Sequence, residues 1–123
     1  MKSSLFGLAL LLSSMQSGAA TVPKAGLYTT EADSCNFNIH IRGKERLLQE
    51  YTSVGRLCDD PGRTYEFTLL DGRYVGAEYK FSGATYRDVL DPLREDLIRA
   101  TIERNVNGKW VLDEGPILYK RND

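Results

Sequence analysis

The sequence is poor in the residues on which many enzymes and metal sites depend. It has one histidine and two cysteines, too few for a zinc site with four ligands of these types. Its 16 Lys and Arg and its 17 Asp and Glu nearly balance, and the two signs are interspersed. A nucleic-acid binder should show a clustered basic face, so this class is excluded. Neither an EF-hand loop nor a Walker phosphate loop occurs. We therefore expect no metal, no cofactor and no catalytic residues.

Long apolar runs are also scarce, and the clearest one lies at the N-terminus. Residues 5–12 follow Lys2 and precede the small residues Ser17-Gly18-Ala19-Ala20. This order is typical of a secretory signal peptide, and the run is too short to cross a membrane of about 30 Å as a helix. The sequence thus predicts a signal peptide over 1–20 and a single domain over 21–123, with no membrane span. The protein is expected to be secreted, or periplasmic in a bacterium.

The two cysteines, Cys35 and Cys58, lie in the exported part of the chain. Disulfides persist in oxidising compartments, and this pair lacks the spacing of a redox motif. The loop that a bridge would close gives roughly 3–4 kcal/mol in the chain-entropy model. A small domain has about 5–15 kcal/mol of stability in total. We predict a structural disulfide between Cys35 and Cys58.

Alternation of apolar and polar residues dominates the rest of the chain. Cys35, Phe37, Ile39 and Ile41 alternate with polar residues, the pattern of a half-buried strand. Turn residues separate up to eight such segments: 26–30, 35–42, 46–54, 64–70, 73–81, 97–105, 109–114 and 116–121. Regularly spaced short strands predict a mainly β fold, an antiparallel β-barrel or sandwich of 6–8 strands in meander order. A barrel is favoured because closure removes the free edges.

Two hairpins have a glycine in the turn, at Asp71-Gly72 and Asn107-Gly108. A two-residue turn at the first would place Phe67 opposite Gly76. A three-residue loop with a glycine bulge would place Phe67 opposite Val75, so that apolar side chains face each other. We predict the three-residue loop in both hairpins.

One segment, around 86–96, resembles a helix. Asp91 is a suitable N-cap and Pro92 a suitable first helical residue, with acidic residues following in the first turn. We predict a short helix here, followed by a strand over 97–105. The alternative is an α+β fold in which the helix continues to about 105, since Leu93 and Leu97 also fit one helical stripe.

Tyrosines and arginines supply the best candidate for a binding surface. The chain has seven tyrosines, and these two residue types are enriched at protein interfaces. The predicted surface consists of Tyr74, Tyr86, Arg73 and Arg87. Tyrosines at the rim of a small barrel are the plainer interpretation of the same residues.

The single histidine marks a second candidate, a polar site. His40 shares the polar face of its predicted strand with Asn38 and Arg42. A general base also needs an orienting partner and a substrate pocket, and the sequence shows neither. A solvated surface histidine is the simpler interpretation.

These features together favour a binding protein over an enzyme. An exported domain of about a hundred residues with one disulfide and a β-meander resembles small periplasmic lysozyme inhibitors, secreted immunity proteins, small lipocalin-like barrels and fungal secreted effectors. No motif selects one of these groups, so no residue roles are transferred. The first hypothesis is a non-catalytic inhibitor, immunity or effector protein that contacts another protein. The alternative is a lipocalin-like barrel or a small cofactorless enzyme that holds a small molecule in its cavity.

Overall fold

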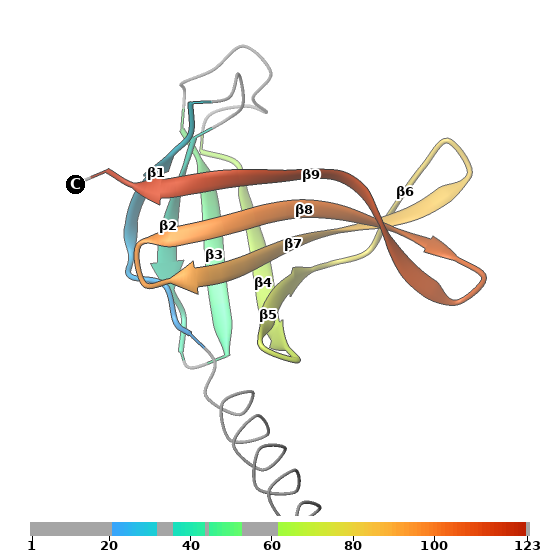
Figure 1. Cartoon of the computed structure of the whole chain (residues 1–123), viewed down its shortest axis with the longest axis horizontal. Helices are drawn as coiled ribbons and strands as arrows, with labels where there is room; N and C mark the ends of the chain where they lie inside the picture. Colours follow the sequence, from blue (N-terminus) through green and yellow to red (C-terminus); the bar gives the residue numbers. More distant parts are fainter. Residues whose placement is uncertain (1–20, 32–35, 44, 53–61, 123) are drawn as a thin grey trace, which may run out of the picture.

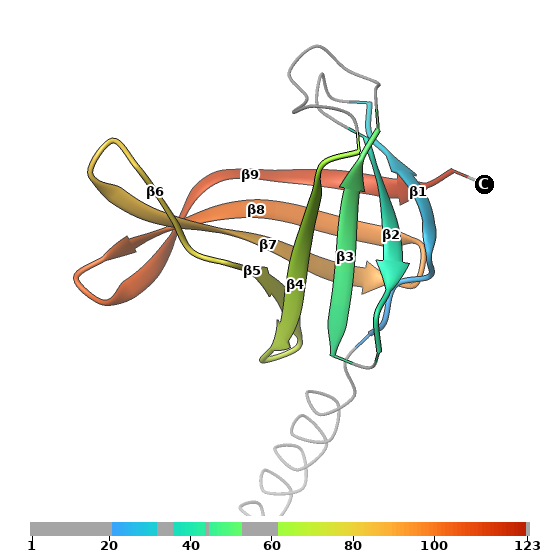
Figure 2. The same cartoon turned by 180° about the vertical axis from the view of Figure 1, so that it is seen from behind.

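The computed structural model describes residues 21–31, 36–43, 45–52 and 62–122. The predicted signal peptide and both cysteines of the predicted disulfide lie outside these ranges. Within them every regular element is a β-strand, as Figures 1 and 2 show from two sides. No helix in these ranges is long and apolar enough to cross a membrane.

The strands follow one another as an antiparallel meander that closes into a barrel. Neighbours in the sheet follow the order β5-β4-β3-β2-β1-β9-β8-β7-β6, and a further pairing of β5 with β7 closes a ring of eight. This confirms the predicted β-barrel. The strands of the described residues are β1 Gly26–Thr29, β2 Phe37–Ile41, β3 Arg46–Tyr51, β4 Thr64–Leu70, β5 Arg73–Gly76, β6 Tyr79–Phe81, β7 Ala84–Arg94, β8 Leu97–Val106 and β9 Lys109–Arg121.

Three of the barrel strands are much longer than the others and extend beyond the barrel. β7, β8 and β9 have 11, 10 and 13 residues. Their outer parts, together with β6, form a twisted sheet that projects to one side (Figures 1 and 2). We call this projection, residues 79–87 and 102–114, the arm. The barrel core does not extend into it.

Aromatic side chains fill most of the barrel interior. The ring of Phe37 lies 4.5 Å from that of Tyr119 and 6.0 Å from that of Tyr28, centroid to centroid. The buried hydroxyl of Tyr28 donates to the carbonyl oxygens of Lys24 at 2.7 Å and Glu95 at 3.0 Å, which satisfies its polar end. The core comprises Tyr28, Phe37, Ile39, Leu47, Phe67, Tyr74, Leu90, Ile98 and Tyr119.

The predicted three-residue hairpin loops are wrong. Leu70 pairs with Arg73, and the two central residues, Asp71 and Gly72, have φ of 52° and 81°, as a type I′ turn requires. Phe67 therefore lies opposite Gly76. The Phe67 ring fills the space that a side chain at 76 would need, since an added Cβ would lie 3.3 Å from Cε2 of the ring. The register of this hairpin is therefore set by the room that Gly76 leaves for the Phe67 ring, and not by the pairing of apolar residues with each other.

The second hairpin repeats this result. Val106 pairs with Lys109, and the two central residues, Asn107 and Gly108, have φ of 53° and 84°. The bulges lie instead further along the same pair of strands, where the register shifts near Ile102. The turn itself is therefore a tight two-residue turn. The irregular pairing of β8 with β9 lies where β9 passes from the barrel into the arm.

The predicted helix around 86–96 is also wrong, and so is its extension to about 105. The segment forms most of β7 and the turn into β8. Asp91 does not cap a helix; its carboxylate accepts from Arg99 on β8 at 2.6 Å. Pro92 sits beside a bulge, where the register shifts between Pro92 and Arg94, a position that tolerates the missing amide donor. The prediction of a strand from residue 97 is confirmed by β8.

Candidate functional site

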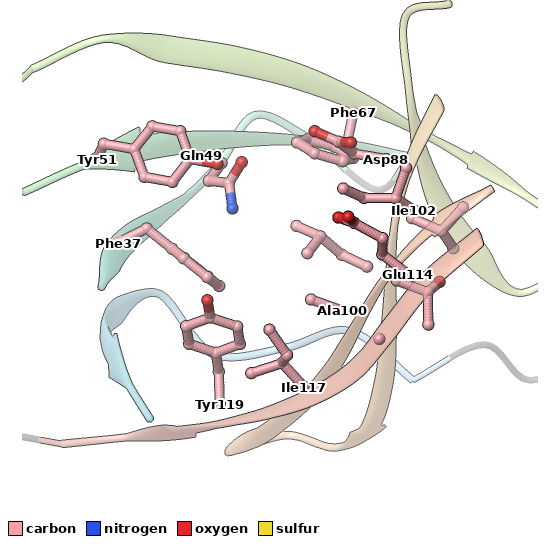
Figure 3. A pocket seen from close by; sticks show the side chains of 14 residues that line it. Phe37, Gln49, Tyr51, Phe67, Asp88, Ala100, Ile102, Glu114, Ile117 and Tyr119 are labelled. Carbon is pink, nitrogen blue, oxygen red and sulfur yellow. The ribbon is translucent and has the colours of Figure 1, made fainter. Parts of the chain in front are cut away.

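A cavity of about 150 Å³ lies where the barrel meets the arm. Figure 3 shows it from close by, with side chains from six strands around it. Aromatic rings of Phe37, Tyr51, Phe67 and Tyr119 form a large part of its wall. The interior of the barrel is therefore filled at one end and hollow at the end from which the arm projects.

The most unusual residue of this cavity is Gln49. It occupies an inward position of β3 between Leu47 and Tyr51, and it is only 4% exposed. Figure 3 shows its side chain extending into the cavity. Its Oε1 has no hydrogen-bond partner. A buried acceptor left unsatisfied costs about 1–3 kcal/mol, so this position carries a cost that the fold alone does not offset.

Two carboxylates face the same cavity from the arm side. Asp88 of β7 and Glu114 of β9 both line it, and each pairs across the sheet with Ile102 of β8 (Figure 3). The Tyr79 hydroxyl donates to Oδ1 of Asp88 at 3.0 Å. Burial, followed by the charge and hydrogen bond of Asp88, raises the pKa of Tyr79 well above its usual value. None of the fourteen lining residues carries a positive charge.

A larger groove of about 450 Å³ adjoins the cavity on its outer side and shares three of its lining residues, Tyr51, Phe67 and Asp88. The groove runs along β4 and the segment between β5 and β6, where Glu66 and Glu78 line it. Arg63 is the one cation among its lining residues, and its guanidinium lies 5.5 Å from the ring centroid of Tyr65. The cavity thus has as its neighbour a surface groove that is itself lined mostly by acidic and aromatic residues.

The outer wall of the barrel carries a tight ionic cluster at the base of the arm. Glu103 of β8, whose side chain is 12% exposed, accepts from Arg87 at 2.8 Å and from Arg73 at 3.0 Å. The Arg87 guanidinium also lies 4.3 Å from the ring centroid of Trp110. Burial alone would raise the pKa of Glu103, but the hydrogen bonds and charges of the two arginines outweigh it, and the pKa is lowered. This cluster joins β5, β7, β8 and β9.

The four residues of the predicted Tyr/Arg surface do not form one exposed patch. Tyr74 is completely buried in the core, so its side chain belongs to no exposed surface. Arg73 and Arg87 both bind Glu103 on the outer wall. Tyr86 is half-buried and stacks on Tyr79 of the arm, with ring centroids 5.9 Å apart.

The predicted polar site lies on the outside of the barrel, away from the cavity. The exposed His40 has its Nε2 2.9 Å from Oε1 of Glu50 on β3. Asn38 is half-buried on the same strand, and Arg42 is exposed just beyond its end. None of these three residues lines a cavity or groove described above. Across the described ranges, no three His, Cys, Asp or Glu side chains are grouped to hold a metal ion.

One face of the arm exposes several large apolar side chains around Arg104. Cross-strand pairs put Tyr79 beside Tyr86, Tyr86 beside Arg104, and Arg104 beside Val111. Paired residues share a face of a sheet, as do residues two apart on a strand. We call Tyr79, Phe81, Tyr86, Val106 and Val111 the arm face. Phe81 is 69% exposed, and the next row of the same face, Asp88, Ile102 and Glu114, leads into the cavity.

Comparison of the chain with family models, with curated proteins and with solved structures gives no match. The site is therefore interpreted from its own geometry.

Sequence reasoning missed the two residues that define the cavity, although each left a signal. Gln49 stands between Leu47 and Tyr51 on the apolar side of an alternating strand, where a polar residue is out of place. Asp88 stands in the same way between Tyr86 and Leu90. A polar residue at an inward position of an alternating strand could therefore have indicated, from the sequence, that the barrel interior contains a cavity.

Proposed function

We propose that this is an exported, non-catalytic binding protein that acts by contact with another protein through its arm face. The observation that carries the proposal is the apolar face of a sheet that projects beyond the barrel core, with Phe81 more than two-thirds exposed. Contiguous exposed apolar patches are uncommon on monomers and mark interaction sites. The signal-peptide pattern of residues 1–20 supports secretion, or periplasmic location in a bacterium.

The composition of the arm suits a protein partner. Aromatic side chains at the centre of an interface contribute most of its binding energy, and charged residues belong at its rim. Tyr79, Phe81 and Tyr86 supply the aromatic centre. Charged residues of the same face lie among and beside the apolar ones: Arg104, Lys109, Asp113 and Glu114. A partner with an apolar patch bordered by charges of both signs would match this face.

Site-specific photo-cross-linking tests the proposal. The photoreactive residue p-benzoylphenylalanine replaces Phe81, or replaces Leu70 as a control that is 48% exposed in the β4–β5 hairpin, off the arm. In the producing cells, position 81 should cross-link to one discrete protein species and position 70 should not. A Phe81→Ser variant should compete poorly with the wild type for that species. Equal products at both positions, or none at position 81, would contradict the proposal.

The proposal includes the Cys35–Cys58 disulfide as the stabilising bridge of the exported form. Intact-mass measurement of the secreted protein, before and after reduction, should show a gain of two hydrogens on reduction. An unchanged mass would show that both thiols are free.

A small-molecule carrier is the second candidate function. The specific observation in its favour is the cavity, where the unsatisfied oxygen of Gln49 and two carboxylates meet. His40, the residue best suited to acid–base chemistry near neutral pH, lies outside that cavity. The geometry therefore supports binding in the cavity and assigns no catalytic step to it.

A further inference from the structure

We propose that the cavity between barrel and arm binds a primary ammonium group carried on a short alkyl chain. This site is distinct from the arm face, and the inference does not depend on the identity of the protein partner. The charge of the cavity, its unsatisfied hydrogen-bond acceptor and its volume each favour such a ligand.

The charge of the cavity favours a cation. Asp88 and Glu114 line it, and no Lys, Arg or His is among its lining residues. A cation bound in this partly enclosed space would be attracted by both carboxylates. The rings of Phe37, Tyr51, Phe67 and Tyr119 add aromatic walls, and a cation that lies over the face of such a ring is attracted to it.

The unsatisfied acceptor explains why the ligand should donate hydrogen bonds. Gln49 Oε1 is buried, has no partner and belongs to a side chain that extends into the cavity (Figure 3). An ammonium group carries three donors, so one that donates to this amide oxygen keeps two further donors for a carboxylate or another acceptor. A neutral apolar occupant would fill the space and leave the oxygen unsatisfied.

The volume sets the length of the chain. A cavity of about 150 Å³ holds a molecule of roughly six heavy atoms, since an engineered cavity of that size accommodates benzene. A four-carbon chain with a terminal ammonium group fits this limit. The same group occurs on a free alkylamine and on a lysine side chain presented by a protein, and the groove along β4 shares three lining residues with the cavity.

Titration of the full secreted protein, followed by amide chemical shifts in NMR, tests the inference. The probes are n-butylammonium chloride, the neutral 1-butanol, calcium chloride, and lysine blocked at both backbone ends. We expect n-butylammonium to shift the Gln49 side-chain amide and the backbone amides of Glu114 and Gly115. The blocked lysine distinguishes the two sources. Comparable binding would indicate a lysine side chain, and binding of the free amine alone would indicate a small-molecule ligand.

Variants separate the proposed contacts from general effects of charge. Asp88→Asn and Glu114→Gln should each weaken n-butylammonium binding about tenfold, which corresponds to about 1.4 kcal/mol. Glu45→Gln makes the same change of charge at an exposed turn that does not line the cavity, and it should leave the affinity unchanged. Gln49→Leu should reduce amine binding and, by removing a buried unsatisfied oxygen, raise the melting temperature.

Several results would overturn the inference. These are equal binding of 1-butanol and n-butylammonium, binding of calcium without binding of the amine, no shifts with any probe, or equal weakening by Glu45→Gln and Glu114→Gln. A Phe81→Ser variant should bind n-butylammonium normally. A failure of the arm-face proposal and a failure of the ammonium site are therefore distinguishable.

Discussion

Gly115 is a position where a single added methyl group should destabilise the barrel. It has φ of 95°, and a Cβ built there would lie 2.8 Å from the carbonyl oxygen of Ala100 and 3.3 Å from Cα of Thr101. Both neighbours are backbone atoms of β8, so no side-chain rotation relieves the contact. The chain at Gly115 also forms part of the cavity wall, where β9 turns from the barrel into the arm.

Gly108 provides the matched control for this substitution. It has a similar φ of 84° at the tip of the β8–β9 hairpin, and nothing lies within 4 Å of an added Cβ. Gly108→Ala should therefore cost only the backbone strain, about 1 kcal/mol. Gly115→Ala carries the same strain and adds an overpacking cost of roughly 1–3 kcal/mol, so the free energy of unfolding should fall by about 2–4 kcal/mol.

Urea and thermal unfolding at neutral pH measure the difference. For a domain of this size each kcal/mol lowers the melting temperature by about 4–8 °C. The melting temperature should therefore fall by about 4–8 °C in Gly108→Ala and by at least about twice as much in Gly115→Ala. Equal losses in the two variants would refute the reasoning, because they would show that the approach of β9 to β8 costs nothing beyond the φ.

Three further predictions concern titratable side chains. Glu103→Gln should lower the free energy of unfolding by about 2–4 kcal/mol at neutral pH, since it leaves Arg87 without its buried carboxylate. Because the pKa of Glu103 is lowered in the folded protein, its stabilisation is complete at neutral pH and is lost as the pH falls through that lowered pKa; the variant should show a flatter acid limb in urea unfolding. His40→Ala should change the free energy of unfolding by less than about 0.5 kcal/mol, since its contact with Glu50 is exposed, and a larger loss would give His40 a structural role. Comparison of the alkaline absorbance titrations of the wild type and Tyr79→Phe gives the pKa of the Tyr79 phenol, which should lie above the usual range. Asp88→Asn should lower the pKa of Tyr79. An ordinary pKa of Tyr79 in the wild type would contradict its hydrogen bond to Asp88.

The architecture followed from local patterns, whereas the registers did not. Alternation around Phe37 and Ile39 predicted strands correctly, because a strand with one buried and one solvated face alternates apolar and polar residues whatever its neighbours are. The pairing of Phe67 depended on a different fact, that Gly76 offers room for a ring, and this is visible only when both strands are in place. Apolar matching therefore favoured Val75, which lies on the other face and pairs with Val89.

The false helix had a similar cause. Asp91 and Pro92 satisfy the local rules for a helix start, and those rules ignore what lies beside the segment. In the folded protein Arg99 binds Asp91 from β8, and the bulge at Pro92 removes the need for its amide donor. Cross-strand partners decided the conformation, and their separation in sequence hides them from a local pattern.

The candidate cavity was the least predictable feature. Asp88 and Glu114 come from different strands. Asp88 meets Ile102 in the regular pairing of β7 with β8, whereas Glu114 meets it only because the register between β8 and β9 shifts there. Gln49 reaches the same space from β3, on another part of the barrel wall. The composition contained no information on which acids would converge there.

The continuity of β7, β8 and β9 has a thermodynamic consequence for recognition. These strands pass from the barrel into the arm without an intervening loop, and the cluster of Glu103, Arg73 and Arg87 binds the sheet at that passage. An arm held in this way is already oriented before it meets a partner, so little conformational entropy remains to be lost on association. A partner would then encounter a fixed surface, and differences in affinity among variants of the arm face should appear mainly in the rate of dissociation.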